Sequence, residues 1–146
     1  MEDNVETTKK KQYQDFKSFV NYIDILTYAL ALSGEKSFSG DPDKWHRAIF
    51  EICKKYKNKI PELKQIYFTY RPPQPPQSEQ VDRLIKVLNM SREISMPNPR
   101  YPRIDLPKDK KNLILKRESE RNKHYLNEIE RIGKILKEKV SASVPS

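Results

Sequence analysis

The chain has 146 residues, of which 36% are hydrophobic and 34% are charged, with 11 prolines and only 3 glycines. This length fits one domain, and so few glycines argue against the glycine-rich loops with which nucleotide-binding α/β folds hold phosphate. The net charge of +9 favours an anionic partner, nucleic acid before a membrane surface or an acidic protein, although a face of solvated lysines would also produce it.

A single cysteine and two histidines leave no internal disulfide and no common structural zinc site. We therefore expect a reducing, cytoplasmic location, no metal and no cofactor. The most apolar run, residues 19–32, is too short to span a bilayer and contains Asn21 and Asp24. The sequence thus predicts no membrane association.

Residues 1–12 and 141–146 are predicted to be disordered tails, which leaves a single domain over 13–140. Apolar residues from Phe16 to Leu30 recur every three or four positions and predict a helix that Gly34 ends. Asp41 as the N-cap and Pro42 at the first position then begin a second helix. Its apolar face is lined by Trp45, Ile49, Ile52, Cys53 and Tyr56.

The middle of the chain is rich in aromatic residues and proline. Residues 66–70 are aromatic and β-branched and predict a short strand, with a helical turn over 62–65 as a possible start. The run Arg-Pro-Pro-Gln-Pro-Pro-Gln over 71–77 predicts a stiff, extended connector. Ser78 then caps a third helix, whose apolar residues recur every three or four positions and form one buried face.

Residues 92–107 cannot be helical because prolines recur through them, and they predict a basic β-hairpin that forms an edge flap. Residues 108–140 predict one long C-terminal helix, with a strand over 112–116 as an alternative. No apolar residue lies between Leu115 and Tyr125, so this stretch is expected to be solvated or to face a charged partner. The apolar stripe that follows has little chain left to cover it and predicts a homodimer, with the interface residues Leu126, Ile129, Ile132, Leu136 and Val140.

Candidate catalytic groups are few. Asp41, Asp43 and His46 suggest a metal or an acid–base pair, but carboxylates at a helix start are explained by capping, and His46 is interpreted as a surface or half-buried packing residue. Cys53 lies two turns from His46 and is interpreted as a core cysteine. No nucleophile, base and orienting group can be assembled, so we predict that the protein is not an enzyme.

The run 78–84 together with 92–99 resembles the helix-plus-wing part of small prokaryotic winged-helix-like proteins, including antitoxin-like modules. The resemblance implies a regulatory DNA-binding or toxin-neutralising role. Flap arginines in winged modules contact phosphate, and the preceding helix enters the major groove. The mixed charge of that helix leaves the flap as the main contact. The predicted nucleic-acid-binding residues are Arg92, Arg100, Tyr101, Arg103, Arg83 and Lys86.

The sequence thus predicts a mainly α fold with a small antiparallel β-hairpin, in which a winged-helix-like core is followed by a long C-terminal helix over about 108–140. The predicted function is that of a non-enzymatic, nucleic-acid-binding regulatory protein with a winged-helix-like module, with double-stranded DNA as its candidate partner. The alternative is a protein-interaction module, either an antitoxin or an adaptor.

Overall fold

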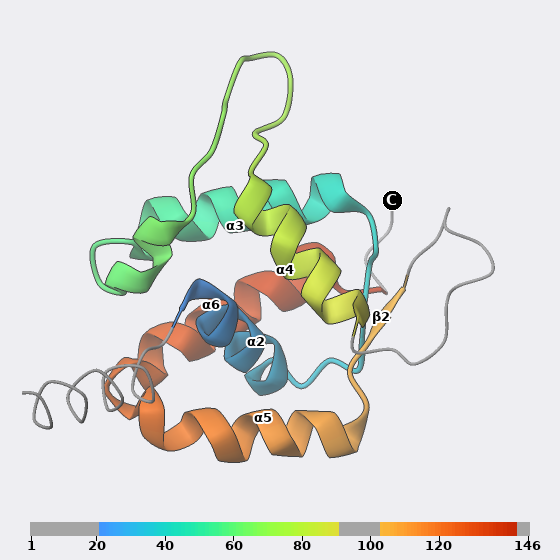
Figure 1. The fold of residues 1–146 in the computed structure, drawn as a ribbon, viewed down its shortest axis with the longest axis vertical. Helices are drawn as coiled ribbons and strands as arrows, with labels where there is room; N and C mark the ends of the chain where they lie inside the picture. Colours follow the sequence, from blue (N-terminus) through green and yellow to red (C-terminus); the bar gives the residue numbers. More distant parts are fainter. Residues whose placement is uncertain (1–20, 91–102, 143–146) are drawn as a thin grey trace, which may run out of the picture.

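The computed structural model describes residues 21–90 and 103–142, a mainly helical fold with a two-stranded antiparallel sheet (Figure 1). This is the predicted fold class. In chain order the elements are α2 (Tyr22–Leu32), β1 (Ser37–Phe38), α3 (Pro42–Tyr56), the 3-10 helix η1 (Pro61–Gln65), α4 (Glu79–Met90), β2 (Ile104–Asp105), α5 (Lys108–Arg121), the 3-10 helix η2 (Lys123–Tyr125) and α6 (Leu126–Val140).

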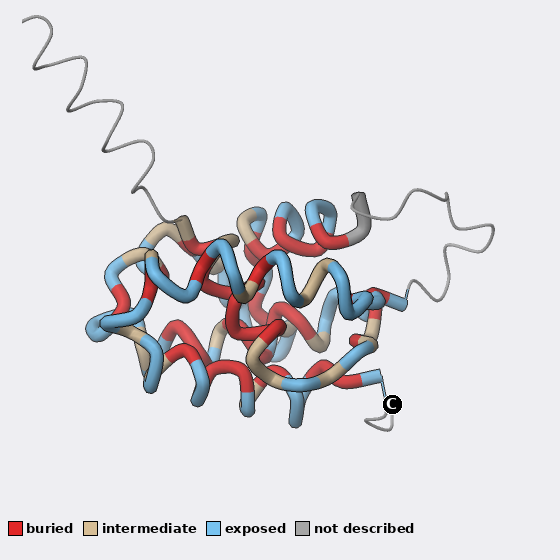
Figure 2. Tube along the Cα trace, turned by 90° about the horizontal axis from the view of Figure 1, so that it is seen from below, coloured by how far each residue is buried: buried red, intermediate tan, exposed pale blue. Residues whose placement is uncertain are grey.

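Helix α2 is the central element, and α5, α6 and η1 pack against it. It begins at a capping box in which the Asn21 side chain accepts the Asp24 N–H at 3.0 Å and the Asp24 carboxylate accepts the Asn21 N–H at 3.2 Å. It ends before Gly34, whose φ of +82° is the left-handed conformation that favours glycine. The predicted C-terminal glycine is confirmed. Buried and exposed stretches alternate along the helices around it (Figure 2).

Helix α3 begins as predicted, with Pro42 in its first turn and the Asp41 carboxylate accepting the Asp43 N–H at 3.0 Å. Trp45, Ile49 and Ile52 are fully buried on its inner face, which packs against α6 and α4. The two helices that surround the first loop are therefore encoded locally, by caps and by apolar spacing.

The predicted strand over 66–70 is wrong. Only Thr69 pairs, in a single antiparallel bridge with Gln77, and the chain between them folds back as a loop that projects beyond α3 (Figure 1). The Gln74 N–H donates to the Arg71 carbonyl at 3.0 Å inside this loop, so residues 71–77 are not an extended connector. A longer ladder is impossible because prolines 72, 73, 75 and 76 have no N–H to donate. The helical turn expected over 62–65 is present as η1.

The single helix predicted over about 108–140 is also wrong, because α5 ends at Arg121 and η2 redirects the chain so that α5 and α6 both pack on α2. Residues 112–116 are helical within α5. The stretch that was expected to be solvated contains two buried polar side chains, Glu118 and Asn122. The Glu118 carboxylate accepts hydrogen bonds from Arg121 at 2.7 Å and from Asn122 at 3.3 Å, so polar contacts hold the turn.

The sheet pairs strands that are distant in the sequence. Strand β2 is antiparallel to β1, with Ser37 opposite Asp105 and Phe38 opposite Ile104, and α3 and α4 lie between the two strands in the chain. It is therefore not the predicted hairpin, of which residues 92–102 lie outside the described residues. On the other edge of β1, Phe38 forms a bridge with Ser141. Residues 141 and 142, which were assigned to the disordered tail, thus belong to the fold.

The apolar stripe of α6 is covered by the chain itself. Ile129, Ile132, Leu136 and Val140 are all fully buried because α6 packs against α2 and α3. These four side chains cannot form the dimer interface that was expected of them, and only Leu126 is partly exposed. The prediction failed because it considered only the short chain after α6, whereas α2 and α3, which come earlier in the chain, cover the stripe.

Gly133 sets the distance between α6 and α2. A Cβ placed there would lie 2.6 Å from the Ala29 carbonyl oxygen, a backbone atom that cannot rotate away. We expect Gly133→Ala to lower the free energy of unfolding by roughly 1–2 kcal/mol despite the better helix propensity of alanine, measured by urea denaturation. Gly34→Ala is the comparison, because a Cβ at Gly34 meets no atom within 4 Å but the φ of +82° strains alanine. It therefore measures backbone strain without steric overlap. An unchanged or raised stability of Gly133→Ala would contradict the close approach.

Candidate nucleic-acid interface

The outer face of α3 carries charged side chains, whereas its inner face is apolar and buried. Lys44, Arg47 and Lys54 on the helix and Lys57 at its C-cap lie three to seven residues apart, interleaved with the buried Trp45, Ile49 and Ile52. Neighbours three and four apart lie on one side of a helix. The amphipathic pattern that buries one side of α3 thus lines up positive charge on the other.

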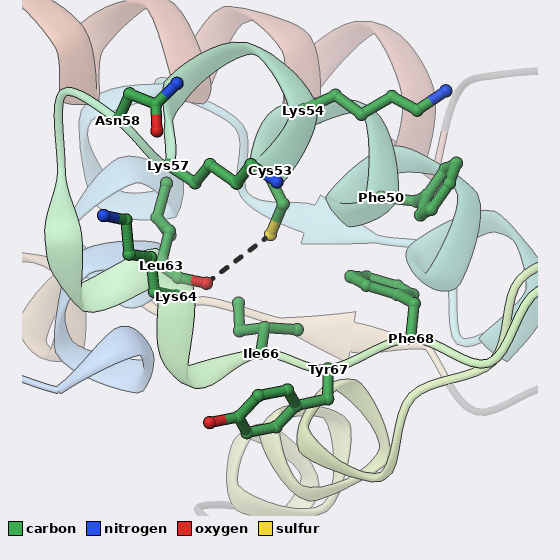
Figure 3. A pocket seen from close by; sticks show the side chains of 10 residues that line it. All are labelled: Phe50, Cys53, Lys54, Lys57, Asn58, Leu63, Lys64, Ile66, Tyr67 and Phe68. Atoms are coloured by element: carbon green, nitrogen blue, oxygen red, sulfur yellow. Dashed lines mark hydrogen bonds between the residues drawn. The ribbon is translucent and has the colours of Figure 1, made fainter.

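A groove of about 500 Å³ runs between α3 and the segment that follows η1 (Figure 3). In the close-up, Lys57, Asn58 and Lys64 lie toward one end of the groove, and Phe50 and Phe68 face each other at the other end. A second hollow of about 420 Å³ adjoins it, since Phe50 and Lys54 line both. The second hollow is also lined by Lys44, Arg47, Tyr70 and Lys139.

Aromatic rings stand among these cations. Phe50 makes edge contacts with Phe68 at 5.0 Å and with Tyr70 at 5.3 Å between ring centroids, and Lys54 Nζ lies 4.7 Å above the Phe50 ring. Such contacts hold the rings and the ammonium group in place at the groove wall. We call this surface the basic–aromatic face, defined by Lys44, Arg47, Lys54, Lys57, Lys64, Phe50, Tyr67, Phe68 and Tyr70.

Main-chain hydrogen bonds fix the loop that carries three of these rings. Thr69 and Gln77 exchange N–H to carbonyl bonds at 2.8 and 3.0 Å, and the Tyr67 N–H donates to Gln80 Oε1 at 3.0 Å. Gln80 lies in the first turn of α4. The aromatic segment is therefore anchored at both ends: Thr69 is held by Gln77 and Tyr67 is held by Gln80 of α4.

His46 joins the two helices behind this loop. It is buried, with Nδ1 accepting the Ser78 N–H at 3.0 Å and Nε2 lying 2.8 Å from Asp82 Oδ1. Since Nδ1 accepts, Nε2 carries the proton and donates to Asp82. The interpretation of His46 as a surface or half-buried residue is wrong: it positions the start of α4 against α3. Asp82, one of the acidic residues that weakened the DNA interpretation, is engaged in this contact.

The positive charge of the face is not neutralised within the described part of the chain. Across residues 21–90 and 103–142, no ion pair includes Lys44, Arg47, Lys54, Lys57 or Lys64. The one acidic side chain that lines either hollow, Glu51, is 3.6 Å from Lys139. The face therefore presents net positive charge to solvent.

Cys53 lines the groove but is chemically inert there. Its Sγ lies 3.9 Å from the Leu63 carbonyl oxygen, as drawn in Figure 3, and burial raises the pKa of its thiol to about 12, against the opposing effect of Lys57. A thiol with such a pKa is protonated at neutral pH and is a poor nucleophile. The interpretation as a buried core cysteine is confirmed.

Of the residues that we predicted to bind nucleic acid, the structure describes Arg83, Lys86 and Arg103. Arg92, Arg100 and Tyr101 lie outside the described residues. Arg103 is 64% exposed, with its Nε 3.1 Å from Asp105 Oδ1.

Arg83 and Lys86 are exposed on α4. Arg83 lies one turn beyond Gln80 and close enough to Tyr22 to oppose the burial that raises the pKa of its hydroxyl.

A separate, mainly apolar groove of about 360 Å³ lies among α2, α4, α5 and β2. Its exposed apolar side chains are Leu113, at 66%, and Val87, at 40%. Asp24, Asp105, Lys110 and Arg117 also line it, so its charge is mixed. This groove differs in character from the basic–aromatic face.

Two further findings restrict the chemistry of the described residues. No group of three His, Cys, Asp or Glu side chains among them is arranged to hold a metal ion, and none of their helices has the length and apolar character needed to cross a bilayer. Comparison of the chain with family models, curated proteins and solved structures gives no significant match. The function is therefore argued from the geometry of the site.

Proposed function

We propose that the protein binds nucleic acid through the basic–aromatic face. The observation that carries the proposal is the line of five cations without acidic partners in the described residues, set along two adjoining grooves with four aromatic rings. Positive charge grouped on one face is the electrostatic footprint of a nucleic-acid-binding protein. Lysine and arginine side chains at such a face contact phosphates, which supplies affinity without sequence choice.

A regulatory role on double-stranded DNA, as the winged-helix resemblance implies, is a separate proposal that rests on residues outside the basic–aromatic face. Its supporting residues are the exposed arginines Arg83 and Arg103, together with the predicted flap residues outside the described part. The shared expectation is strong salt dependence, because each phosphate contact releases bound counterions.

The double variant Lys54→Glu/Lys57→Glu tests the site. Both side chains are exposed on the outer face of α3, so the fold should be retained. We expect binding to an oligonucleotide to weaken at least about tenfold at low salt, and the slope of log affinity against log salt to become shallower by about 1.5, as expected for two lost phosphate contacts. Fluorescence anisotropy of a labelled oligonucleotide across a salt series measures both quantities.

The matched control is Lys108→Glu/Lys116→Glu, which changes the net charge equally on α5. Both lysines are exposed, and α5 lies on the side of the molecule away from α3 (Figure 1). Equal losses in the two variants would show that binding follows net charge and would overturn the site. No binding of the unaltered protein to any oligonucleotide at low salt would overturn the function.

The alternative prediction, a protein-interaction module, is supported by the apolar groove and the exposed Leu113. Exposed apolar grooves are typical of sites that accept a partner's side chain. A stoichiometric protein partner that survives nuclease treatment during purification would favour this alternative over nucleic-acid binding.

A further inference from the structure

We infer that the basic–aromatic face selects single-stranded over double-stranded nucleic acid, an inference that rests on the proposed function. Its basis is the combination of exposed rings on an anchored backbone with phosphate-binding cations in the same groove. The five cations alone would suit either form of nucleic acid. The rings are what distinguish the two.

Tyr67 is an exposed aromatic side chain on a fixed backbone. Its ring is 71% exposed, while its N–H is held by Gln80 at 3.0 Å and the preceding Ile66 is buried. Figure 3 shows the Tyr67 ring at the edge of the groove, directed away from Phe50. An aromatic ring that stays exposed to water does not gain the free energy of burying its apolar surface. An ordered segment that holds such a ring at the surface is therefore suited to binding a planar ligand.

Tyr70 provides a second ring at the other hollow. It is 50% exposed, and its ring meets Phe50 nearly perpendicularly, at 85°. Phe50 therefore packs against the Tyr70 ring from within the face, and half of the Tyr70 surface remains accessible to a ligand. Tyr67 and Tyr70 line the first and second hollows respectively, so the two exposed rings are distributed along the line of cations.

Unpaired bases are the planar ligands that fit beside phosphate-binding cations. In a duplex the faces of the bases are stacked on one another and only their edges are accessible, whereas an unpaired base can stack on an aromatic side chain. From Lys44 to Lys57 the helix rises about 20 Å at 1.5 Å per residue, which gives a track long enough for several nucleotides. The negative strand and the positive track are complementary in charge, and the exposed rings of Tyr67 and Tyr70 commit the occupant to single-stranded nucleic acid.

The test compares Tyr67→Ala with Tyr67→Phe. Anisotropy is measured with a labelled mixed-sequence oligonucleotide of about 12 nucleotides, as a single strand and annealed to its complement, in DNA and in RNA. We expect the unaltered protein to bind the single strand at least about tenfold more tightly than the duplex. Tyr67→Ala should weaken single-strand binding by about fivefold to a hundredfold, the loss expected for one stacked base, and leave duplex binding within about twofold. Tyr67→Phe should retain the single-strand affinity, because its ring still stacks.

The outcomes distinguish this inference from the function on which it rests. Equal affinity for the two forms, or an unaltered single-strand affinity in Tyr67→Ala, overturns the strand preference. If Lys54→Glu/Lys57→Glu still weakens binding in that case, the proposed function stands. If neither form binds at low salt, both fall together. Thermal melting checks that Tyr67→Ala remains folded, as its exposure predicts.

Discussion

Replacing Trp45 with alanine is expected to lower the free energy of unfolding by about 4 kcal/mol, within the range for deleting a large buried aromatic side chain. Trp45 is fully buried on α3, and its ring lies 6.1 Å from that of Phe38 in β1. Its Nε1–H also donates to the Ser39 carbonyl at 2.6 Å. The change therefore leaves a cavity where α3 meets the sheet and an acceptor without its donor.

The control is Trp45→Phe, which keeps an apolar ring but removes the hydrogen bond, so we expect a loss of roughly half that size. Far-UV circular dichroism during urea unfolding is the appropriate measurement, because Trp45 is the only tryptophan and both variants lose its fluorescence. A loss below about 1 kcal/mol for Trp45→Ala would show that the surrounding residues collapse into the space.

Helices α2 and α3 could be predicted because their signals are local. Gly34 after α2 and the Asp41–Pro42 start of α3 act within one turn of each helix. The Asn21 capping box is equally local but was missed, because the helix predicted from Phe16 to Leu30 ran through Asn21, which is the N-cap of α2. The pairing of β1 with β2 had no such signal. It joins two residues after α2 to two residues before α5, and strands this short carry too little pattern to identify a distant partner.

The basic–aromatic face was only partly visible in the sequence. The spacing of Lys44, Arg47, Lys54 and Lys57 is complementary to the apolar positions of α3 and could have been recognised. The contribution of Tyr67 and Tyr70 could not, since it depends on a loop that folds back through the Thr69–Gln77 bridge and on a hydrogen bond to Gln80. These contacts are tertiary, and the aromatic run itself favoured a strand.

Replacing Glu118 with alanine is expected to lower the free energy of unfolding by about 3 kcal/mol at neutral pH, at the low end for breaking a buried charge network, because Arg117 and Arg121 retain access to water. The side chain is fully buried on α5 and accepts hydrogen bonds from Arg121 and Asn122. Arg121 also lies 3.7 Å from Asp24 of α2. Urea denaturation measures the loss, and Glu120→Ala, at an exposed position on the same helix, is the control.

The pH dependence of Glu118→Gln separates the charge of the group from its hydrogen bonds. Burial, reinforced by Asp24 and opposed by Arg121 and Arg117, raises the pKa of Glu118 above its ordinary value of 4.5. Because the folded state disfavours the ionised form, the proton-linked part of the stabilisation by Glu118 is greatest below pH 4.5 and is lost as the pH rises through the folded-state pKa. The packing and hydrogen bonds that Glu118→Ala removes do not depend on that shift. The stability of the unaltered protein relative to Glu118→Gln should therefore fall as the pH rises from 4.5 through the raised folded-state pKa. A difference that stays constant or grows with pH would mean that Arg121 and Arg117 outweigh the cost of burial.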